Sequence, residues 1–403
     1  MTAIFTNKNQ LFLVVIASLG YFVDIYDIVL FNIVKETSLK DLGIWTKEVE
    51  VSLFNWQMTG MMIGGVFWGI LGDKVGRIKV LFGSILLYSL ANIFNAYAFD
   101  ITSYKWLRFI AGFGLAGELG AGITLILETM DKKNRGWGTM IMVSFGALGA
   151  CFAFYVGQFG WKTAFWVGGI LGLILLLMRM KSLESDLFKN MNQNKNKGNI
   201  FLLFTTKKMF LKYMACIGMG LPIWFVVSIL IGLSSSYFSE ILNIKISVGK
   251  AVMYCYIGLA LGDLISGFLS QIFYNRLKII QLFLLFTFVL LLIYIYFIHS
   301  ISSDLFYFIC VILGIVSGYW ALFVTVAAEQ FGTNIRSTVA STVPNWVRGA
   351  VVPITLSFKY LAATTLGIMN ATLIVGGICL LIAVLSSMYL KETFGKELDY
   401  IED

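Results

Sequence analysis

The sequence has little charge, proline or histidine. Only 13% of its 403 residues are charged, about half of the share in a typical soluble domain, whereas 59% are hydrophobic. A soluble domain of this length cannot bury so much apolar surface, so we expect the lipid bilayer to surround the chain. Cytosolic enzymes, secreted disulfide scaffolds and nucleic-acid-binding modules are therefore excluded. The net charge of +8 fits the excess of Lys and Arg in the cytoplasmic loops of membrane proteins.

The residues for a metal site, a disulfide framework or a nucleotide site are also missing. The chain has one His, and its five Cys all lie in apolar runs without C-x-x-C spacing. The phosphate-binding pattern G-x-x-x-x-G-K-[ST] does not occur, which argues against ATP-driven transport. We therefore predict no enzyme activity, no metal, no cofactor and no nucleic-acid partner. The expected partners are the lipid bilayer, a small solute and protons, for a chain that acts as a monomer.

Twelve apolar runs are long enough to cross a membrane as helices of about 20 residues. The first run is too long for the core of a signal peptide and contains two Asp. A polar insert rich in Lys and Asn separates the sixth run from the seventh. We therefore predict an all-α membrane protein with an N-terminal six-helix bundle (1–180), a cytoplasmic linker (181–208) and a C-terminal six-helix bundle (209–403). The predicted spans are 11–34, 51–72, 78–98, 103–129, 136–158, 161–180, 209–237, 248–273, 278–298, 304–330, 337–361 and 366–390.

An internal repeat supports this division. Glu128 stands seven residues before Arg135 at the end of the fourth run, and Glu329 stands seven before Arg336 at the end of the tenth. Two parallel halves around a site at the bilayer midplane are the plan of a transporter. The distribution of Lys and Arg predicts that both termini and the linker are cytoplasmic, in a bacterial-type inner membrane.

A charged, glycine-rich turn joins the second and third runs. It reads Gly69-Ile-Leu-Gly72-Asp73-Lys74-Val-Gly76-Arg77-Ile-Lys79-Val-Leu81. The glycines permit a tight turn and a close approach of helices. Asp73 would stand at a helix C-terminus, where the helix dipole disfavours a carboxylate. It therefore needs a partner, such as Arg77 or the N-terminus of a neighbouring helix.

This turn resembles the G-x-L-x-D-[RK]-x-G-R-[RK]-x-x-L signature of the major facilitator superfamily. The resemblance implies two pseudo-symmetric six-helix bundles and a latch that closes the cytoplasmic side in the outward-open state. A positive-inside hairpin without a latch is the alternative. In the second half the corresponding turn has Gln271 in place of the Asp, so a charge latch there should be weaker or use Asp263. The expected gating residues are Gly69, Asp73, Gly76, Arg77, Glu128, Arg135, Glu329 and Arg336.

The fourth run carries a second pattern of the same family. Arg108-Phe-Ile-Ala-Gly112-Phe-Gly114 resembles its R-x-x-x-G-x-G motif. The end of the tenth run is similar to the metabolite–proton symporters and to the phagosomal amino-acid transporters. The antiporter signature of the fifth run requires a Pro that this chain lacks, which disfavours drug efflux.

Ionisable residues inside spans are costly in a bilayer, so each is a functional candidate. Asp24 and Asp27 lie one turn apart in the first run, and two carboxylates so close cannot both ionise easily. In related symporters an Asp of the first span pairs with the Arg of the fourth, which here implies Asp27 with Arg108. Glu118 is a further candidate proton carrier. The alternatives are a static ion pair between the spans and a permanently neutral, hydrogen-bonded Glu118.

The eleventh run carries a polar stripe. Thr338, Ser341, Asn345, Arg348 and Thr355 fall within about 80° on a helix, so they must face protein or a water-filled cavity. Arg348 offers a two-pronged contact for a carboxylate, and we predict it to be the substrate anchor. The alternative is a structural partner for Glu329 or another acid. The predicted substrate-binding residues are Arg348, Asn345, Trp346, Ser341, Tyr21 and Trp320.

Together these observations predict a secondary transporter that works by alternating access. The preferred prediction is proton-coupled uptake of a small carboxylate-bearing nutrient, an amino acid. The alternatives are import or export of a polycarboxylate, such as a siderophore or organic acid, and, from another class, a channel or a non-transporting receptor.

Overall fold

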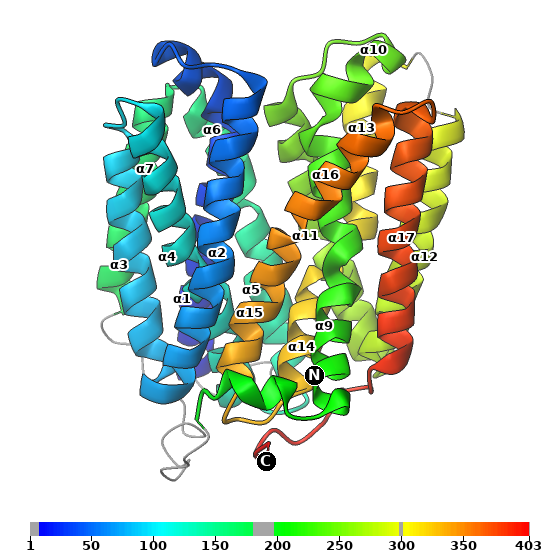
Figure 1. Ribbon diagram of the computed structural model, residues 1–403. Helices are drawn as coiled ribbons and strands as arrows, with labels where there is room; N and C mark the ends of the chain where they lie inside the picture. The colour runs from blue at the N-terminus through cyan, green and yellow to red at the C-terminus, as the bar shows by residue number, and fades with distance from the viewer. Residues whose placement is uncertain (1–7, 180–196, 298–300, 403) are drawn as a thin grey trace.

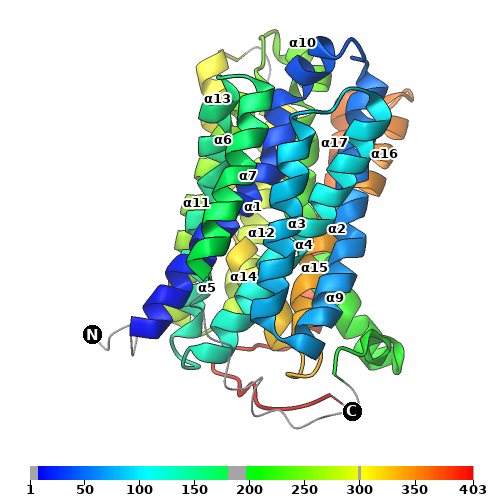
Figure 2. The ribbon, with the colours of Figure 1, turned by 90° about the vertical axis from the view of Figure 1, so that its left-hand side faces the viewer.

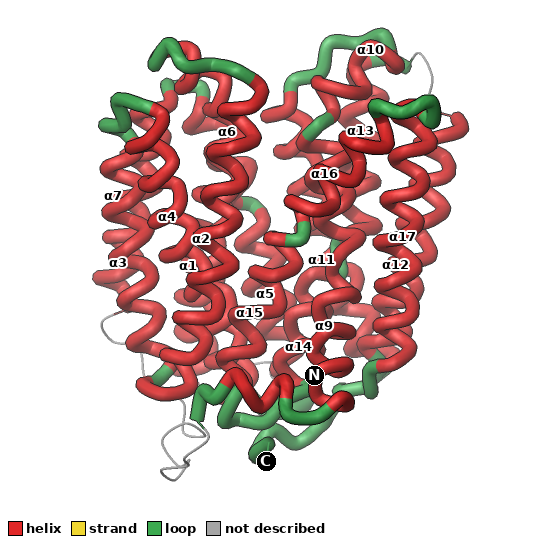
Figure 3. The backbone as a smooth tube through the Cα atoms, in the orientation of Figure 1, coloured by secondary structure: helices red, strands yellow, loops and turns green. Residues whose placement is uncertain are grey.

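A computed structural model describes residues 8–179, 197–297 and 301–402 of the chain. In these residues it consists of helices and loops alone (Figure 3). The twelve predicted spans are confirmed, several of them as two consecutive helices (Figure 1). The spans are α1 (Lys8–Asp41), α2 (Lys47–Val75), α3 (Arg77–Asn95), α4 (Ile101–Thr129), α5 (Arg135–Ala147) with α6 (Gly149–Gly157), α7 (Trp161–Met178), α9 (Lys207–Phe225) with η3 (Val226–Gly232) and η4 (Ser234–Phe238), α11 (Val248–Phe273), α12 (Arg276–Phe297), α13 (Ser303–Ser317) with α14 (Trp320–Glu329), α15 (Arg336–Gly349) with α16 (Val351–Ala362), and α17 (Gly367–Tyr389).

By length and composition alone, ten of the spans are long and apolar enough to cross a membrane. The other two are α2 and the span formed by α15 and α16, which carry the glycine-rich turn and the polar stripe. Their polarity is expected of helices that face protein rather than lipid. Two short helices lie outside the spans, namely η2 (Ile200–Phe204) and α10 (Ser239–Leu242).

Prolines interrupt the two spans that border the centre of the molecule. Pro353 lacks the N–H that would bond to the carbonyl of Gly349, and α15 gives way to α16 at Ala350. Pro222 lies near the end of α9, which continues as the wider π-helix η3. Helix breaks of this kind leave backbone groups available near the midplane.

The helices form two groups, which we call the N half (α1–α7) and the C half (α9–α17). Figure 1 shows the groups side by side, and Figures 1 and 2 show both ends of the chain on one face, which we call the terminal side. On this side α15 packs on α2 and α4, and α5 packs on α11 and α14. The boundaries proposed for the linker stay a prediction, since residues 180–196 lie outside the described part of the chain.

Glycines allow this close contact between the halves. A Cβ on Gly69 would lie 2.8 Å from the Cα of Thr338, and one on Gly72 would lie 2.2 Å from the Oγ of Ser337. A side chain at Gly69 would force α2 away from α15, because it would meet backbone atoms, whereas one at Gly72 would require the Ser337 side chain to move. The terminal side is therefore closed by backbone-to-backbone packing as well as by charge.

Candidate transport pathway

Asp73 closes the terminal side by capping a helix of the other half. Its carboxylate accepts hydrogen bonds from the backbone N–H groups of Ser337 (3.0 Å) and Thr338 (2.8 Å) and from Oγ1 of Thr338 (2.7 Å). These groups belong to the first turn of α15, where the positive end of the helix dipole favours an anion. Arg77, the other partner expected from the sequence, lies 3.6 Å away. Gly76 between them has a φ of 110°, which a side chain would disfavour.

Beside this cap lies a buried triad that we call latch A: Arg77, Glu128 and Arg336. Oε1 of Glu128 accepts from Arg77 at 2.7 Å and from Arg336 at 3.1 Å. Arg336 belongs to the C half, so one carboxylate joins two cations from the two halves. Arg77 also donates to the carbonyl of Thr333 across the interface, at 3.3 Å. Opening of the terminal side must break these contacts.

A second triad, latch B, repeats this arrangement with the halves exchanged: Arg135, Glu329 and Arg276. Arg135 forms an ion pair with Glu329 at 2.7 Å, and Arg276 donates to the other carboxylate oxygen. The Glu and the Arg of each sequence repeat therefore pair with residues of the opposite half. Arg276 has in latch B the place that Arg77 has in latch A. Only the alignment of the two sequence repeats could have indicated this role.

Of the two expectations for the second latch, the one that uses Asp263 is wrong, and the one that latch B is weaker stays a prediction. The charges of latch B are complete, and Asp263 takes no part, because its Oδ1 accepts from the N–H of Ala321 at the start of α14 (2.8 Å). What latch B lacks is the carboxylate cap. Gln271 lies at the start of α5, where a Cβ on Gly136 would come within 2.1 Å of its Nε2. An amide there offers no negative charge to the helix N-terminus.

The C-terminal segment Leu390–Glu402 runs across both latches. Its Leu398 carbonyl accepts from Arg336 of latch A at 2.5 Å, and its Lys396 carbonyl accepts from Arg135 of latch B. Lys132 of the N half pairs with Glu397, and this hydrogen bond holds the pKa of Glu397 below its usual value. The segment therefore contacts both halves while they are closed against each other.

A small cavity lies near the middle of the molecule, where Arg348 meets Asp24. Nη2 of Arg348 lies 3.6 Å from Oδ2 of Asp24, and both side chains are fully buried. Arg348 also donates to Oδ1 of Asn345 (3.3 Å), and its guanidinium lies 5.6 Å from the ring centre of Trp320. The cavity has a volume of about 30 Å³, room for one or two water molecules. Its lining is largely aromatic and aliphatic, and includes Tyr21, Ile25, Val143, Ala147, Ile223, Trp224, Tyr256, Asp263 and Trp320.

The predicted substrate-binding residues fall into three groups. Tyr21 and Trp320 line the central cavity with Arg348. Asn345 and Ser341 are buried between the halves. The Asn345 amide donates to the carbonyl of Ala116 (3.0 Å), and a Cβ on Gly120 would meet Ser341 at 2.1 Å.

Trp346 lies apart from the other predicted substrate-binding residues in this conformation, and its role stays a prediction. Its side chain is 40% exposed and lines none of the three cavities described here. It follows Asn345 by about 100° around the helix, which turns it away from the polar stripe.

Asp27 and Arg108 are both fully buried, but no hydrogen bond or direct ion pair joins them in the described part of the chain. The guanidinium lies instead against the rings of Phe31 and Phe165, 5.4 Å from each centre. The two charges still act on each other through space. The expected direct pairing of Asp27 with Arg108 is therefore not formed in this conformation.

Glu118 has a partner that the sequence did not indicate. Its two carboxylate oxygens accept from Arg179 at 2.8 and 2.5 Å, and both side chains are buried. Arg179 also donates to the carbonyl of Ile16, so the pair holds α1, α4 and the end of α7 together. Arg179 lies at the end of a span, where Lys and Arg are common, so its position alone does not identify it as a partner. The unmet charge of a buried Glu118 was the signal that could have identified it.

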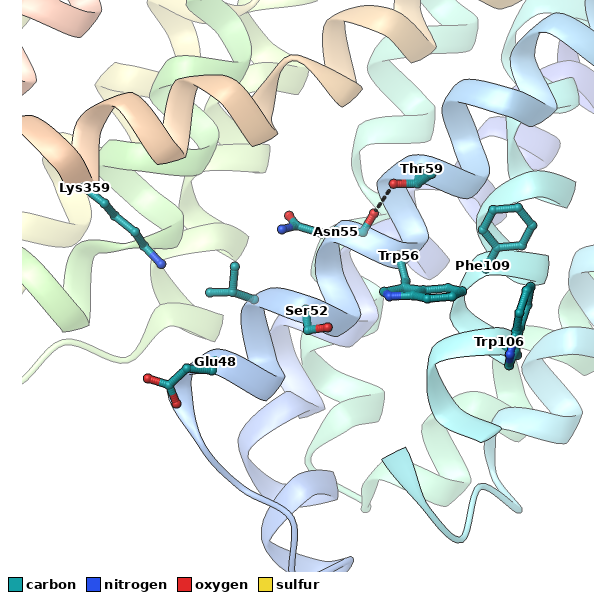
Figure 4. A pocket seen from close by; sticks show the side chains of 9 residues that line it. Glu48, Ser52, Asn55, Trp56, Thr59, Trp106, Phe109 and Lys359 are labelled. Atoms are coloured by element: carbon teal, nitrogen blue, oxygen red, sulfur yellow. Dashed lines mark hydrogen bonds between the residues drawn. The ribbon is translucent and has the colours of Figure 1, made fainter. Parts of the chain in front are cut away.

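Two larger cavities open on the side opposite the termini. The first, of about 750 Å³, is lined by Glu48, Val51, Ser52, Asn55, Trp56, Thr59, Trp106, Phe109 and Lys359 (Figure 4). The second, of about 290 Å³, shares Val51, Asn55 and Lys359 with it and shares Trp224, Val227 and Tyr256 with the central cavity. We call the second one the vestibule. The structure is thus closed on the terminal side and accessible from the other.

A comparison with known families decides the assignment. The profile described as Major Facilitator Superfamily matches residues 17–343, most of the chain. The chain belongs to the Major Facilitator Superfamily. Two solved members share its fold, a proton:xylose symporter XylE (TM-score 0.74, 15% identity, 98% of both chains) and FucP in the outward conformation (TM-score 0.74, 12% identity, 94% of this chain and 98% of that one).

Curated members of the Major Facilitator Superfamily resemble part of the sequence. The matches include the niacin transporter NiaP of Acinetobacter baylyi (32% identical over 42% of this chain and 40% of that protein) and the 3-(3-hydroxy-phenyl)propionate transporter of Escherichia coli (33% over 35% and 36%). A benzoate transport protein of Acinetobacter baylyi is 29% identical over 43% of this chain and 39% of that protein. The matched segments span well under half of these relatives. As a superfamily member, the chain is a multi-pass membrane protein of a transporter family and not an enzyme.

Replacing Glu118 with Gln distinguishes a structural ion pair with Arg179 from a role as proton carrier. Breaking one side of a buried ion pair costs about 3–5 kcal/mol, because the remaining charge has no partner. We expect Glu118→Gln to lower the thermal unfolding temperature in detergent, and Glu118→Gln with Arg179→Gln to recover most of the loss. A Glu118→Gln protein that keeps its stability but no longer accumulates substrate under a pH gradient would instead identify Glu118 as a proton carrier.

Deleting residues 397–403 should loosen the terminal side. The deletion removes the Leu398 carbonyl from Arg336, a hydrogen bond to a charged group of about 1.5–3 kcal/mol. We expect faster amide hydrogen exchange in the peptide 332–342, which begins α15, and little change in α12. The matched control is Ile401→Ala, which changes an exposed side chain of the same segment. Equal exchange in both variants would show that the segment does not stabilise the closed side.

Proposed function

We propose that this transporter takes up a small aromatic monocarboxylate together with a proton. The observation that carries the proposal is the buried pair of Asp24 and Arg348 beside a cavity with aromatic walls. A guanidinium binds any carboxylate by the same geometry, so a substrate carboxylate can replace Asp24 as its partner. The similar transporters named for niacin, benzoate and 3-(3-hydroxy-phenyl)propionate support an aromatic acid.

This exchange of partners couples the substrate to a proton. Once a substrate carboxylate occupies Arg348, a charged Asp24 would remain buried without a partner, which is strongly unfavourable. Binding of a proton by Asp24 removes that penalty. Substrate anion and proton therefore bind together, and neither is retained alone. Asp27 lies one turn further along α1 near Arg108 and is the candidate for a second proton-binding position.

The conformation supports transport of the substrate into the cell. With the termini in the cytoplasm, as the positions of Lys and Arg predict, the vestibule faces outward and the latches close the inner side. Substrate would enter through the vestibule, and breaking both latches would open the cytoplasmic side. In this orientation the chain is a proton symporter of a bacterial inner membrane.

An amino acid is the second candidate, because Asp263 also lines the central cavity and could accept an ammonium group. One oxygen of Asp263, however, already accepts a hydrogen bond from the N–H of Ala321 at the start of α14. An aromatic acid requires no such acceptor and is therefore preferred. A polycarboxylate would need further cations, and Arg348 is the one cationic residue among those that line this cavity.

Uptake into liposomes tests the proposal. The purified protein should accumulate labelled benzoate or nicotinate when the outside is acidic, and phenylalanine and citrate serve as alternatives. Asp24→Asn should abolish accumulation driven by the pH gradient but keep the exchange of labelled for unlabelled acid. Accumulation of phenylalanine alone would favour the amino acid. Net flux without exchange would indicate a channel.

A further inference from the structure

We propose that Lys359 of α16 forms a first binding site for the substrate carboxylate in the vestibule, before the acid reaches Arg348. This inference rests on the proposed function, in that the substrate is a small aromatic acid. It adds a site near the opening of the pathway to the one at the centre. Three observations carry it: the sizes of the cavities, their shared walls and the position of one cation.

The central cavity cannot hold an aromatic acid in this conformation. Its volume of about 30 Å³ suffices only for water, whereas the vestibule has about 290 Å³. Pockets for small molecules begin at about 300 Å³. In the present conformation, which is open on the side opposite the termini, the vestibule is therefore the first space that can enclose the ring of an aromatic acid.

Lys359 provides the cation for such a site. It lines both the vestibule and the open cavity outside it, and its side chain points from α16 toward the start of α2 (Figure 4). The other lysine of the vestibule, Lys35, is paired with Glu50 at 3.6 Å. Within the described residues no carboxylate lies at ion-pair distance from Lys359. A half-buried ammonium in this situation can accept an arriving carboxylate as its partner.

The walls of the vestibule connect this cation to the central site. Trp224 and Tyr256 line both cavities. The ring of Trp224 lies 6.4 Å from that of Trp320, which in turn lies beside Arg348. Aromatic walls favour an aromatic ring along the whole path. The carboxylate would thus move from Lys359 to Arg348 while its ring stays in contact with aromatic side chains.

A different role for Lys359 predicts a different result. Glu48 lies near it on α2 (Figure 4), so the two residues could pair when the opposite side closes. In that case Lys359 would affect the conformational step and not the first encounter with substrate. The two roles are separable by kinetics, because a binding site changes KM and a gate changes the maximal rate.

The test is exchange of labelled benzoate in liposomes containing the full chain. We expect Lys359→Gln to raise KM about fivefold, the effect of one partly exposed ion pair, with little change in maximal rate. Lys359→Arg should restore KM. Lys250→Gln, which removes an exposed lysine of the same face that lines none of the cavities, is the matched control.

Each outcome decides between the possibilities. An unchanged KM in Lys359→Gln, or a lower maximal rate alone, overturns the vestibule site while leaving the proposed function intact. Failure of the unmodified protein to exchange benzoate or nicotinate overturns the proposed function, and the vestibule site with it. A raised KM in Lys359→Gln that Lys359→Arg restores supports the site.

Discussion

Replacing Arg348 with Gln should weaken binding of the aromatic acid by about ten- to a hundredfold. The variant loses a charge-assisted contact of about 1.5–3 kcal/mol to the substrate carboxylate. Binding of an uncharged amide analogue, such as nicotinamide for nicotinate, should change much less. Equilibrium binding of both compounds to the purified protein, for the wild type and for Arg348→Gln, measures this difference directly.

The matched control removes both members of the buried pair. Arg348→Gln alone leaves Asp24 charged without a partner, which destabilises the protein independently of any substrate. Arg348→Gln with Asp24→Asn avoids this and should be closer to the wild type in thermal stability, while still failing to distinguish acid from amide. If Arg348→Gln discriminates between acid and amide as strongly as the wild type, then Arg348 is not the anchor. Arg108, which has no direct ion pair, becomes the next candidate.

In the proposed function, the charges of the central region require that a proton accompany the anion. Three buried carboxylates stand near three buried guanidinium groups: Asp24 beside Arg348, Glu118 paired with Arg179, and Asp27 attracted by Arg108 through space. These three pairs are balanced without substrate, and Asp263, which also lines the central cavity, adds a fourth buried carboxyl group. An added carboxylate would leave a net negative charge in a low-dielectric region unless one acid binds a proton. Asp24 is the acid whose partner the substrate would take.

Much of the fold followed from periodicity and composition, because a span needs only length and apolarity. The polar stripe of α15 correctly placed Arg348 inside the protein. The dipole argument indicated that Asp73 needs a partner, with Arg77 and a helix N-terminus as the candidates, and the N-terminus of α15 is the closer one. Both arguments are local, in that they depend on residues of one helix. Trp346 lies outside the stripe, so the stripe gives no support to its predicted role in substrate binding.

Pairings between distant segments could not be predicted in the same way. Arg348 was expected to bind substrate or another acid, and its partner Asp24 lies more than 300 positions earlier in the chain. Glu118 pairs with Arg179, and the repeat residues Glu128 and Glu329 pair across the halves. A single sequence indicates which buried carboxylates need a cationic partner. It does not indicate which one, because several cations could pair with each carboxylate equally well. The volume of the central cavity could not be predicted from the sequence either, because it depends on the conformation.

The two latches differ in the carboxylate cap, and this difference determines which latch is stronger. Latch A combines its triad with the Asp73 cap on α15, whereas latch B has Gln271 at the start of α5. A carboxylate near a helix N-terminus contributes about 0.3–1 kcal/mol, and up to about 2 in a buried geometry. The repeated architecture is therefore symmetric in its triads but asymmetric in its caps, and we expect latch A to dominate the stability of the closed side.

Replacing Glu128 with Gln should therefore open the terminal side. The carboxylate is shared by Arg77 and Arg336, so its loss removes the nearest counterion of two buried guanidinium groups and leaves Asp73 at 3.6 Å from Arg77. Breaking a buried pair costs about 3–5 kcal/mol, and about 5.5 kcal/mol moves a two-state equilibrium from 1:99 to 99:1. We expect a large shift toward the conformation in which the halves separate on this side, because that separation lets water reach both cations.

Distances between spin labels on the two faces measure this shift, in a background without the five Cys. Labels at Lys74 and Lys207, both exposed on the terminal side, should move apart in Glu128→Gln, while labels at Lys162 and Lys250 on the opposite side should approach each other. Gln271→Asp supplies the missing cap of latch B and should shift both distances in the reverse direction. Unchanged distances in a Glu128→Gln protein that retains its unfolding temperature would show that latch A does not hold the halves together. The closed side would then depend on the packing of α2 against α15, where Gly69→Ala would be the substitution to examine next.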